Sequence, residues 1–234
     1  MSTRLSPVFL FAFATILIAP PMVSGPAYCK ESKVVKLPAP RLDGPVSVEK
    51  ALAGRRSIRT FASWPVTLAE VSQLLWAAQG ITVKRGNREL RTAPSAGALY
   101  GLETYLLAAD VTGLAQGLYR YRPDSHTLAF LSPGDSREEL SKAAFNQTCI
   151  RDGAALIIFT GIYERVTKKY VERGVKFVHM EAGHAAENVY LEAEALGLGT
   201  VAAGSFDEKE AKRILNLPEN EDPLYIMPVG RKVE

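Results

Sequence analysis

An uninterrupted apolar run at residues 154–160, Ala-Ala-Leu-Ile-Ile-Phe-Thr, constrains the fold more than any other stretch of the chain. A strand with one solvent-facing side alternates apolar and polar residues, so a run without alternation predicts a strand buried on both faces. Residues 178–196 follow with apolar side chains at helical spacing, which predicts a long helix. The chain therefore predicts a buried central strand and a long helix that follows it.

Further helices and strands alternate along the sequence. Thr67 and Glu70 form a capping box, and Gly80 ends the helix that this box begins. Other helices are expected at 47–54, 136–145 and 207–215, and other strands at 103–109, 117–122, 127–131, 200–203 and 224–229. Residues 84–91 are polar and predict a loop, whereas 117–122 and 127–131 flank a Pro-Asp turn and predict a hairpin. Interleaved helices with hairpins predict a mixed α+β fold, with a mainly antiparallel central sheet flanked by helices.

Length and charge limit the domain organisation and the kinds of partner that the protein can have. A chain of 234 residues with 47% hydrophobic content fits one large domain, here expected at 47–234, after an extended, proline-rich lead-in at 28–46. The formal net charge is +3 and the basic residues are scattered. This pattern lacks the concentrated positive charge of a nucleic-acid-binding surface, so we expect no nucleic-acid partner.

The first 27 residues predict a cleaved signal peptide. Arg4 supplies a positive charge, and residues 8–19 form an uncharged, mostly apolar run that Pro20 and Pro21 end. Such a run is too short to span a bilayer comfortably, which favours a signal peptide over a permanent anchor. We therefore expect an exported protein of the bacterial periplasm, without a stable membrane span. An oxidising compartment would permit a bridge between Cys29 and Cys149, although Cys29 lies in the lead-in.

Arginines gather in the stretch Arg55-Arg56-Ser57-Ile58-Arg59. If the stretch is extended, Arg55, Ser57 and Arg59 point the same way. Two guanidinium groups with a hydroxyl between them can receive a phosphate-sized dianion. The alternative interpretation is a solvated basic segment at the end of a helix.

Small residues mark two more stretches. Pro94-Ser95-Ala96-Gly97 would let the backbone approach a flat ligand closely, although a tight turn with Ser95 capping a helix is the alternative. Residues 197–204 carry three glycines, but the third is too far along and the helix precedes the strand. A dinucleotide fingerprint needs the opposite order, so we do not predict a nicotinamide-type Rossmann site.

The histidines and the paired lysines carry weaker signals. His126, His179 and His184 lack metal-ligand spacing, so no metal is expected. His184 is predicted to be a hydrogen-bonded histidine at the start of the long helix. Lys168-Lys169-Tyr170 is most simply a solvated helix face.

Four stretches in this order resemble the nitroreductase superfamily, within it the SagB-type or thiazole-oxidase-like branch. They are RRSIRTF at 55–61, APSAGALYGLETY at 93–105, GHAAENVYLEAEALGLGTVAAGSFD at 183–207 and LYIMPVGRK at 224–232. The resemblance implies a fold that binds FMN at a homodimer interface. Arg55, Ser57 and Arg59 are then expected at the phosphate, ribityl chain and ring edge, with Arg231 closing on the phosphate.

The resemblance also places the small-residue stretches. Pro94, Ser95 and Ala96 would pack on the flavin of the partner subunit, and residues 202–205 would lie along the ring near N5. The expected cofactor-binding set is Arg55, Arg56, Ser57, Arg59, Pro94, Ser95, Ala96, Gly97, Ala202, Ala203, Gly204, Ser205 and Arg231. Azoline-oxidising relatives have an active-site Lys-Tyr pair, and Lys169-Tyr170 lies in a similar place. No catalytic residue is assigned from the sequence.

The implied function is an FMN-dependent oxidoreductase. It would move a hydride through flavin N5 between an unknown donor and an organic, nitro or quinone acceptor of small-molecule size. The alternatives are a protein that binds or consumes flavin without redox turnover, and an exported structural domain with a decayed site. Gly101, Glu187 and Ala202 replace a proline, a glutamine and a proline common in the family, and these departures concern the substrate side.

Overall fold

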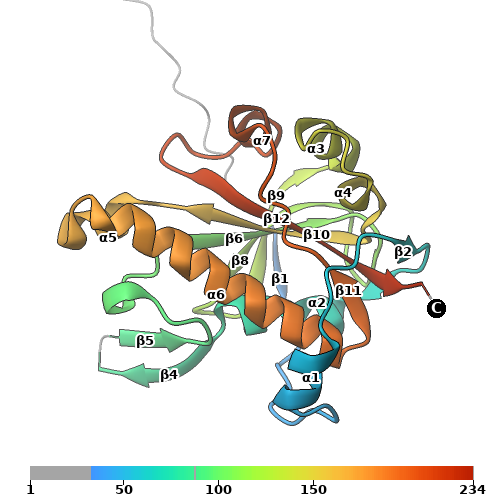
Figure 1. Ribbon diagram of the computed structural model, residues 1–234, viewed down its shortest axis with the longest axis horizontal. Helices are drawn as coiled ribbons and strands as arrows, with labels where there is room; N and C mark the ends of the chain where they lie inside the picture. Colours follow the sequence, from blue (N-terminus) through green and yellow to red (C-terminus); the bar gives the residue numbers. More distant parts are fainter. Residues whose placement is uncertain (1–32, 87, 234) are drawn as a thin grey trace, which may run out of the picture. The chain divides into compact units, whose positions relative to one another are not determined.

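The computed structural model describes residues 33–86 and 88–233. The predicted signal peptide at 1–27, Cys29 of the predicted bridge, and residues 28–32 of the lead-in lie outside this part of the chain. The described residues form one main sheet of eight strands (Figure 1). These strands are β1 (Val34–Lys36), β2 (Phe61–Ala62), β6 (Leu102–Ala108), β8 (Gly117–Arg122), β9 (Thr127–Pro133), β10 (Ala155–Gly161), β11 (Leu198–Thr200) and β12 (Asp222–Lys232).

All pairings in this sheet are antiparallel. The strand order is β1-β9-β8-β6-β10-β12-β11, and β2 pairs with the end of β12. The predicted 117–122 and 127–131 hairpin is confirmed as β8 and β9. The predicted α+β fold with a mainly antiparallel sheet flanked by helices is therefore confirmed.

The apolar run at 154–160 is buried on both faces as predicted, because β10 lies between β6 and β12. Ile157 and Phe159 are 1% and 0% exposed and pack in a core shared with α2 (Leu68–Gln79) and α6 (Arg173–Ala195). Leu156 and Ile158 pack in a second core, on the side of the shorter helices. These are α3 (Arg137–Ala143), α4 (Thr148–Asp152) and α7 (Glu208–Ile214).

Helix boundaries follow the capping signals. Thr67 and Glu70 form the predicted capping box of α2, and Gly80 ends that helix. The long helix α6 begins at Arg173, earlier than predicted, because Gly174 is a poor helix former and Val175 is exposed, so its first turn lacks the buried apolar spacing of the rest. Two more helices precede these elements: α1 (Val48–Gly54), capped by Ser47, and α5 (Glu164–Tyr170), which Val171 at a φ of 51° separates from α6.

One expectation about an irregular segment was wrong. The segment predicted as a loop at 84–91 contributes to a hairpin of β4 (Ile81–Arg85) and β5 (Arg88–Arg91); Lys84 and Glu89 face each other at 2.7 Å across it. Its polar residues stabilise the pair through cross-strand charge, a signal that apolar alternation does not reveal. The lead-in contains β1, which pairs with β9 at the sheet edge. A further pair, β3 (Val66–Thr67) and β7 (Val111–Thr112), is parallel.

The strand predicted at 200–203 ends at Thr200. Beyond it, the amide of Ala202 donates to the Tyr190 hydroxyl rather than to a neighbouring strand. Ala203 then makes a single antiparallel bridge to Ile226 of β12. The chain therefore leaves the sheet at a position where a helix side chain satisfies its backbone.

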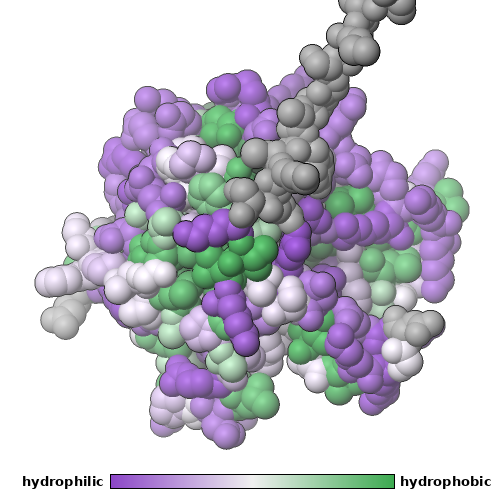
Figure 2. All heavy atoms as spheres, turned by 180° about the vertical axis from the view of Figure 1, so that it is seen from behind, coloured by the Kyte–Doolittle hydropathy of each residue, from purple (hydrophilic) through white to green (hydrophobic). Residues whose placement is uncertain are grey.

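Figure 1 shows α6 lying across one face of the sheet. Figure 2 views the domain from behind, where hydrophilic side chains cover much of the surface and the β4–β5 hairpin forms a lobe at lower right. Among the residues described, none of the helices combines the length and the apolar character needed to cross a membrane.

Candidate functional site

The arginine-rich stretch is attached to the sheet through its apolar residues. A Cβ added to Gly199 would lie 2.7 Å from Ile58 Cγ2, and one added to Gly230 would lie 2.7 Å from Phe61 Cγ. These two glycines are paired in the register of β11 and β12. The Ile58 amide also donates to Thr200 O at 2.9 Å. Ile58 and Phe61 thus occupy space that the glycines leave open.

The same contact explains why glycine occurs at position 199. It is required by side-chain packing against a strand, not by a phosphate-binding turn. This agrees with the sequence argument against a dinucleotide fingerprint.

Replacing Gly199 with alanine is expected to lower the free energy of unfolding by about 1–3 kcal/mol, since the new methyl group overlaps Ile58. Urea unfolding of the full chain measures this change. Gly44→Ala is the matched control, because nothing lies within 4 Å of a Cβ at Gly44. Equal stability of the two variants would show that the stretch is not attached in this way.

Tyr190 of α6 connects the predicted cofactor residues. Its hydroxyl lies 3.1 Å from Ser57 Oγ and accepts the Ala202 amide at 2.8 Å. The Arg55 guanidinium lies over its ring, 5.3 Å from the centroid, and is 3.9 Å from Glu187. The sequence shows Tyr190 only as one apolar position of the long helix, so its connecting role was missed.

The two other arginines of the stretch have different surroundings. Arg56 donates to the backbone carbonyls of Ala53 and Arg55, at 3.1 and 2.7 Å. Arg59 is exposed, and within residues 33–86 and 88–233 it makes no hydrogen bond or ion pair. Burial raises the pKa of Cys149, and the nearby charge of Arg59 opposes this rise. Arg59 therefore lies toward α4 and is free to meet an anion.

The basic residues at the end of β12 point in opposite directions. Arg231 donates to both carboxylate oxygens of Glu70, at 2.6 and 2.9 Å, and to Pro65 O at 3.2 Å. Lys232 instead binds Glu194 at 2.6 Å, and a Cβ on Gly54 would lie 2.6 Å from the same carboxylate. Lys232 thus lies on the side of α1 and the arginine stretch.

The contact between Arg231 and Glu70 is an electrostatic one. Burial acts to raise the pKa of Glu70, but hydrogen bonds from Arg231 and Thr67 outweigh it and hold the pKa below its usual value. The predicted contact of Arg231 with a phosphate would require release from this bidentate pair, so it stays a prediction.

The Pro94–Gly97 stretch contains the 3₁₀ turn η1 (Ala96–Ala98). Ser95 does not cap this turn; its Oγ accepts the Tyr100 amide at 2.9 Å. Beneath the stretch, Glu181 of α6 accepts the Gly101 amide at 3.4 Å. Burial raises the pKa of Glu181, with hydrogen bonds from Ser95 and the Gly101 amide opposing it.

His184 lies in the middle of α6, not at its start as predicted, because the helix begins at Arg173. Its Nδ1 is 3.3 Å from Pro94 O, which makes it a contact of the small-residue stretch. His179 pairs with Tyr163 at 2.7 Å instead.

Lys169 and Tyr170 are placed against Gly97. A Cβ on Gly97 would lie 2.9 Å from Tyr170 Oη and 3.0 Å from Lys169 Nζ, and Gly97 has a φ of 64°. The Lys169 ammonium is 5.2 Å from the centroid of the Tyr170 ring. The pair therefore belongs to the small-residue stretch and is more than a solvated helix face.

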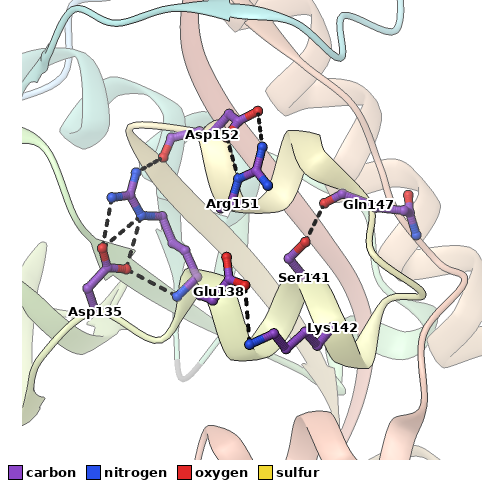
Figure 3. Close-up of polar contacts among 9 residues, drawn as sticks. Asp135, Glu138, Ser141, Lys142, Gln147, Arg151 and Asp152 are labelled. Carbon is purple, nitrogen blue, oxygen red and sulfur yellow. Dashed lines mark hydrogen bonds and ion pairs between the residues drawn. The ribbon is translucent and has the colours of Figure 1, made fainter.

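Residues 203–205 are held by contacts with β12 and with the segment that precedes α4. Ala203 exchanges two backbone hydrogen bonds with Ile226, each 3.0 Å. Gln147 donates to Ser205 O at 2.8 Å. Figure 3 shows how Gln147 is fixed in turn, since Ser141 donates to its carbonyl at 2.9 Å within the connection from α3 to α4. Gly204 packs against Tyr225.

Some of the predicted cofactor residues thus form two groups that contact α6, whereas Arg56, Arg59, Arg231 and residues 203–205 have other partners. Arg55, Ser57 and Ala202 gather at Tyr190, whereas the Pro94–Gly97 stretch gathers at Glu181 and His184. His184 and Tyr190 are about 9 Å apart along the helix axis. No hydrogen bond or ion pair joins the two groups within the described part of the chain.

Comparison with known proteins identifies the family. The model of the nitroreductase family matches residues 52–231, which contain both groups. The chain belongs to this family. Its members typically bind FMN, they include FMN-dependent NAD(P)H oxidoreductases, and they typically act as dimers on small-molecule substrates.

Three relatives illustrate the range of similarity. The chain is 44% identical over 189 residues to "Putative nitroreductase MJ1384" of Methanocaldococcus jannaschii, covering 81% of this chain and 93% of that one. A solved structure described as a nitroreductase of Ralstonia eutropha has a TM-score of 0.73 at 28% identity, covering 87% and 91%. The microcin B17-processing protein McbC of Escherichia coli is 28% identical over 157 residues, covering 60% of this chain and 54% of that protein.

Proposed function

We propose that this protein is an FMN-dependent oxidoreductase whose cofactor phosphate and ribityl chain meet Arg55, Ser57 and Arg59. The single observation that carries the proposal is the convergence of Arg55, Ser57 and the Ala202 amide on Tyr190. Family membership supports the choice of FMN among phosphate-bearing ligands.

The residues present fit this cofactor. A phosphate dianion prefers guanidinium donors, and Arg59 has no competing carboxylate among the residues described, while Glu187 is 3.9 Å from Arg55. A planar ring needs a surface that side chains leave open. Ala96 and Ala202, which are partly exposed, offer small side chains for that surface.

Bound FMN would supply a centre that accepts and donates a hydride. The chain's own residues would bind and orient it. Tyr190 holds the Ser57 hydroxyl and the Ala202 amide in one arrangement, and Gln147 fixes Ser205.

We also propose that the working form is a homodimer. The two groups are separated along α6 within one chain, so a partner chain would bring its Pro94–Gly97 stretch to the Tyr190 group. The outer face of α6 offers an exposed surface for this, with Met180 47% exposed and open space beside Gly183. Sedimentation of the purified protein at two times the chain mass tests this point.

We propose that the protein acts on substrates like those of the SagB-type branch of the family. Lys169 and Tyr170 lie beside Gly97, where the resemblance to azoline-oxidising relatives places a Lys-Tyr pair. Similarity to the microcin-processing protein McbC supports the same branch. We propose that this pair holds or moves a proton on an organic substrate.

Export of the chain would determine which electron donors it can meet. If residues 1–27 direct secretion, the donor is proposed to be an organic substrate of the periplasm, not a nicotinamide cofactor. Fractionation of the source cells and N-terminal sequencing of the mature protein test this. An uncleaved chain in the cytosol with efficient NADH turnover would contradict it.

Replacing Tyr190 with phenylalanine is expected to weaken FMN binding about fivefold, because the Ser57 hydroxyl and the Ala202 amide lose their common partner. Quenching of FMN fluorescence on titration measures the dissociation constant. Tyr163→Phe is the control, because its hydroxyl bonds to His179 away from this group. Equal affinities of the two variants would remove Tyr190 from the site.

The oxidoreductase function itself is tested by a redox cycle. Purified protein saturated with FMN should lose its flavin absorption under an anaerobic reductant and regain it on addition of a quinone or nitroaromatic compound. Binding without reoxidation by any acceptor would favour the alternative of a flavin-binding protein without turnover.

A further inference from the structure

A second pocket, of 470 Å³, lies beside the β4–β5 hairpin and outside the residues assigned to the cofactor. Its walls come from β5, β6, β8, α5 and the segment after η1. The lining residues used below are Arg91, Tyr100, Glu103, Arg120 and Arg165. Its volume is within the range of small-molecule sites, about 300–1,000 Å³.

The pocket lining carries one more positive than negative side chain: Arg91, Arg120, Arg122 and Arg165 against Glu89, Glu103 and Asp124. Arg120 donates to Glu103 at 3.1 Å, and Arg165 donates to the other oxygen of the same carboxylate. Arg165 also donates to Tyr100 O at 3.1 Å. One carboxylate therefore serves two guanidinium groups, each of which has donors to spare.

Arg91 adds a third guanidinium group, whose charge interacts with those of Glu103 and Glu181. It stacks on the Tyr100 ring at 4.3 Å and donates to Gln79 at 2.9 Å. Its Nε is buried without a hydrogen-bond partner, and it makes no ion pair among the described residues. A buried Nε without a hydrogen-bond partner is costly, and an oxygen of a bound anion would supply the missing acceptor.

We propose that this pocket, which we call the arginine pocket, binds the carboxylate or phosphate group of a small-molecule ligand. Arg91, Arg120 and Arg165 present planar donors that match such a group. Glu103 holds two of the arginines in place and competes with the ligand for them. Tyr100 and Leu99 form an apolar wall for the rest of the molecule.

The position of the arginine pocket connects it to the proposed redox site. Arg165 and Lys169 are four residues apart on α5, so they share a face of that helix. Lys169 lies against Gly97. An anion at Arg165 would therefore anchor a substrate whose remainder extends toward the flavin. This link rests on the proposed function, but the binding of the anion does not.

The test is isothermal titration of the full chain, saturated with FMN if it binds, using malonate and inorganic phosphate as separate probes at low salt. Saturable binding of one anion per chain is expected, and the stronger probe identifies the group. Arg120→Gln and Arg165→Gln should each raise the dissociation constant at least about tenfold. Arg151→Gln, which alters an exposed pair with Asp152, should leave it unchanged.

The Glu103→Gln variant distinguishes an anion-binding site from a network of ion pairs that only stabilises the fold. Removing the competing carboxylate should lower the dissociation constant, whereas a structural network would lose only stability. The proposal is overturned if neither probe binds saturably, or if Arg120→Gln and Arg165→Gln bind as the unaltered protein does. Anion binding without FMN uptake would refute the proposed function and leave the arginine pocket in place.

Discussion

An Arg55→Ala variant is expected to bind FMN about 10- to 150-fold more weakly than the unaltered protein, the loss of one charge-assisted contact to a phosphate. Arg55 is the arginine of its stretch that lies on the Tyr190 ring, beside Ser57. Its only carboxylate neighbour among the described residues, Glu187, is 3.9 Å away, so the guanidinium retains donors for a ligand. Fluorescence titration at fixed ionic strength gives both dissociation constants.

Two further variants make this result specific. Arg213→Ala removes an exposed arginine that pairs with Glu210 on α7, and it should bind FMN normally. Arg56→Ala should have a smaller effect than Arg55→Ala, because Arg56 donates to backbone carbonyls. An Arg55→Ala variant with unchanged affinity would mean that the phosphate lies elsewhere.

Replacing Phe159 with alanine is expected to lower the free energy of unfolding by about 3–5 kcal/mol. Phe159 is 0% exposed and lies in β10, between Thr104 of β6 and Tyr225 of β12. Its loss would leave a cavity in the core shared with α6. Because α6 carries both groups of predicted cofactor residues, FMN affinity should fall as well.

Phe145→Ala provides the matched control. Phe145 is 67% exposed, so the same truncation should change the free energy of unfolding by less than about 0.5 kcal/mol. Urea unfolding of both variants decides the matter. Similar losses in the two would contradict the arrangement of β10 at the centre of the sheet.

Local patterns in the sequence predicted the parts of the fold that local physics determines. The apolar run of β10, the capping box of α2 and the β8–β9 hairpin each follow from residues close in the chain. The β4–β5 hairpin did not, because its stability comes from paired charges such as Lys84 and Glu89. The start of α6 was misplaced because its first turn contains a glycine and an exposed valine instead of buried apolar residues at helical spacing.

In the candidate site too, the sequence predicted some of the residues but not the contacts between them. The resemblance selected Arg55, Ser57 and Ala202, but their common contact with Tyr190 depends on the packing of α6 against distant segments. No spacing in the sequence could reveal that contact. Likewise, the sequence could not show that Arg231 turns to Glu70 while Lys232 turns toward α1.

FMN titration of the purified protein, followed by absorbance and by the stoichiometry at saturation, is the most direct test of FMN binding. We expect a yellow protein that takes up one FMN per chain, with uptake weakened by Arg55→Ala and little affected by Arg213→Ala. A folded protein that stays colourless and shows no saturable uptake at any FMN concentration would contradict this expectation.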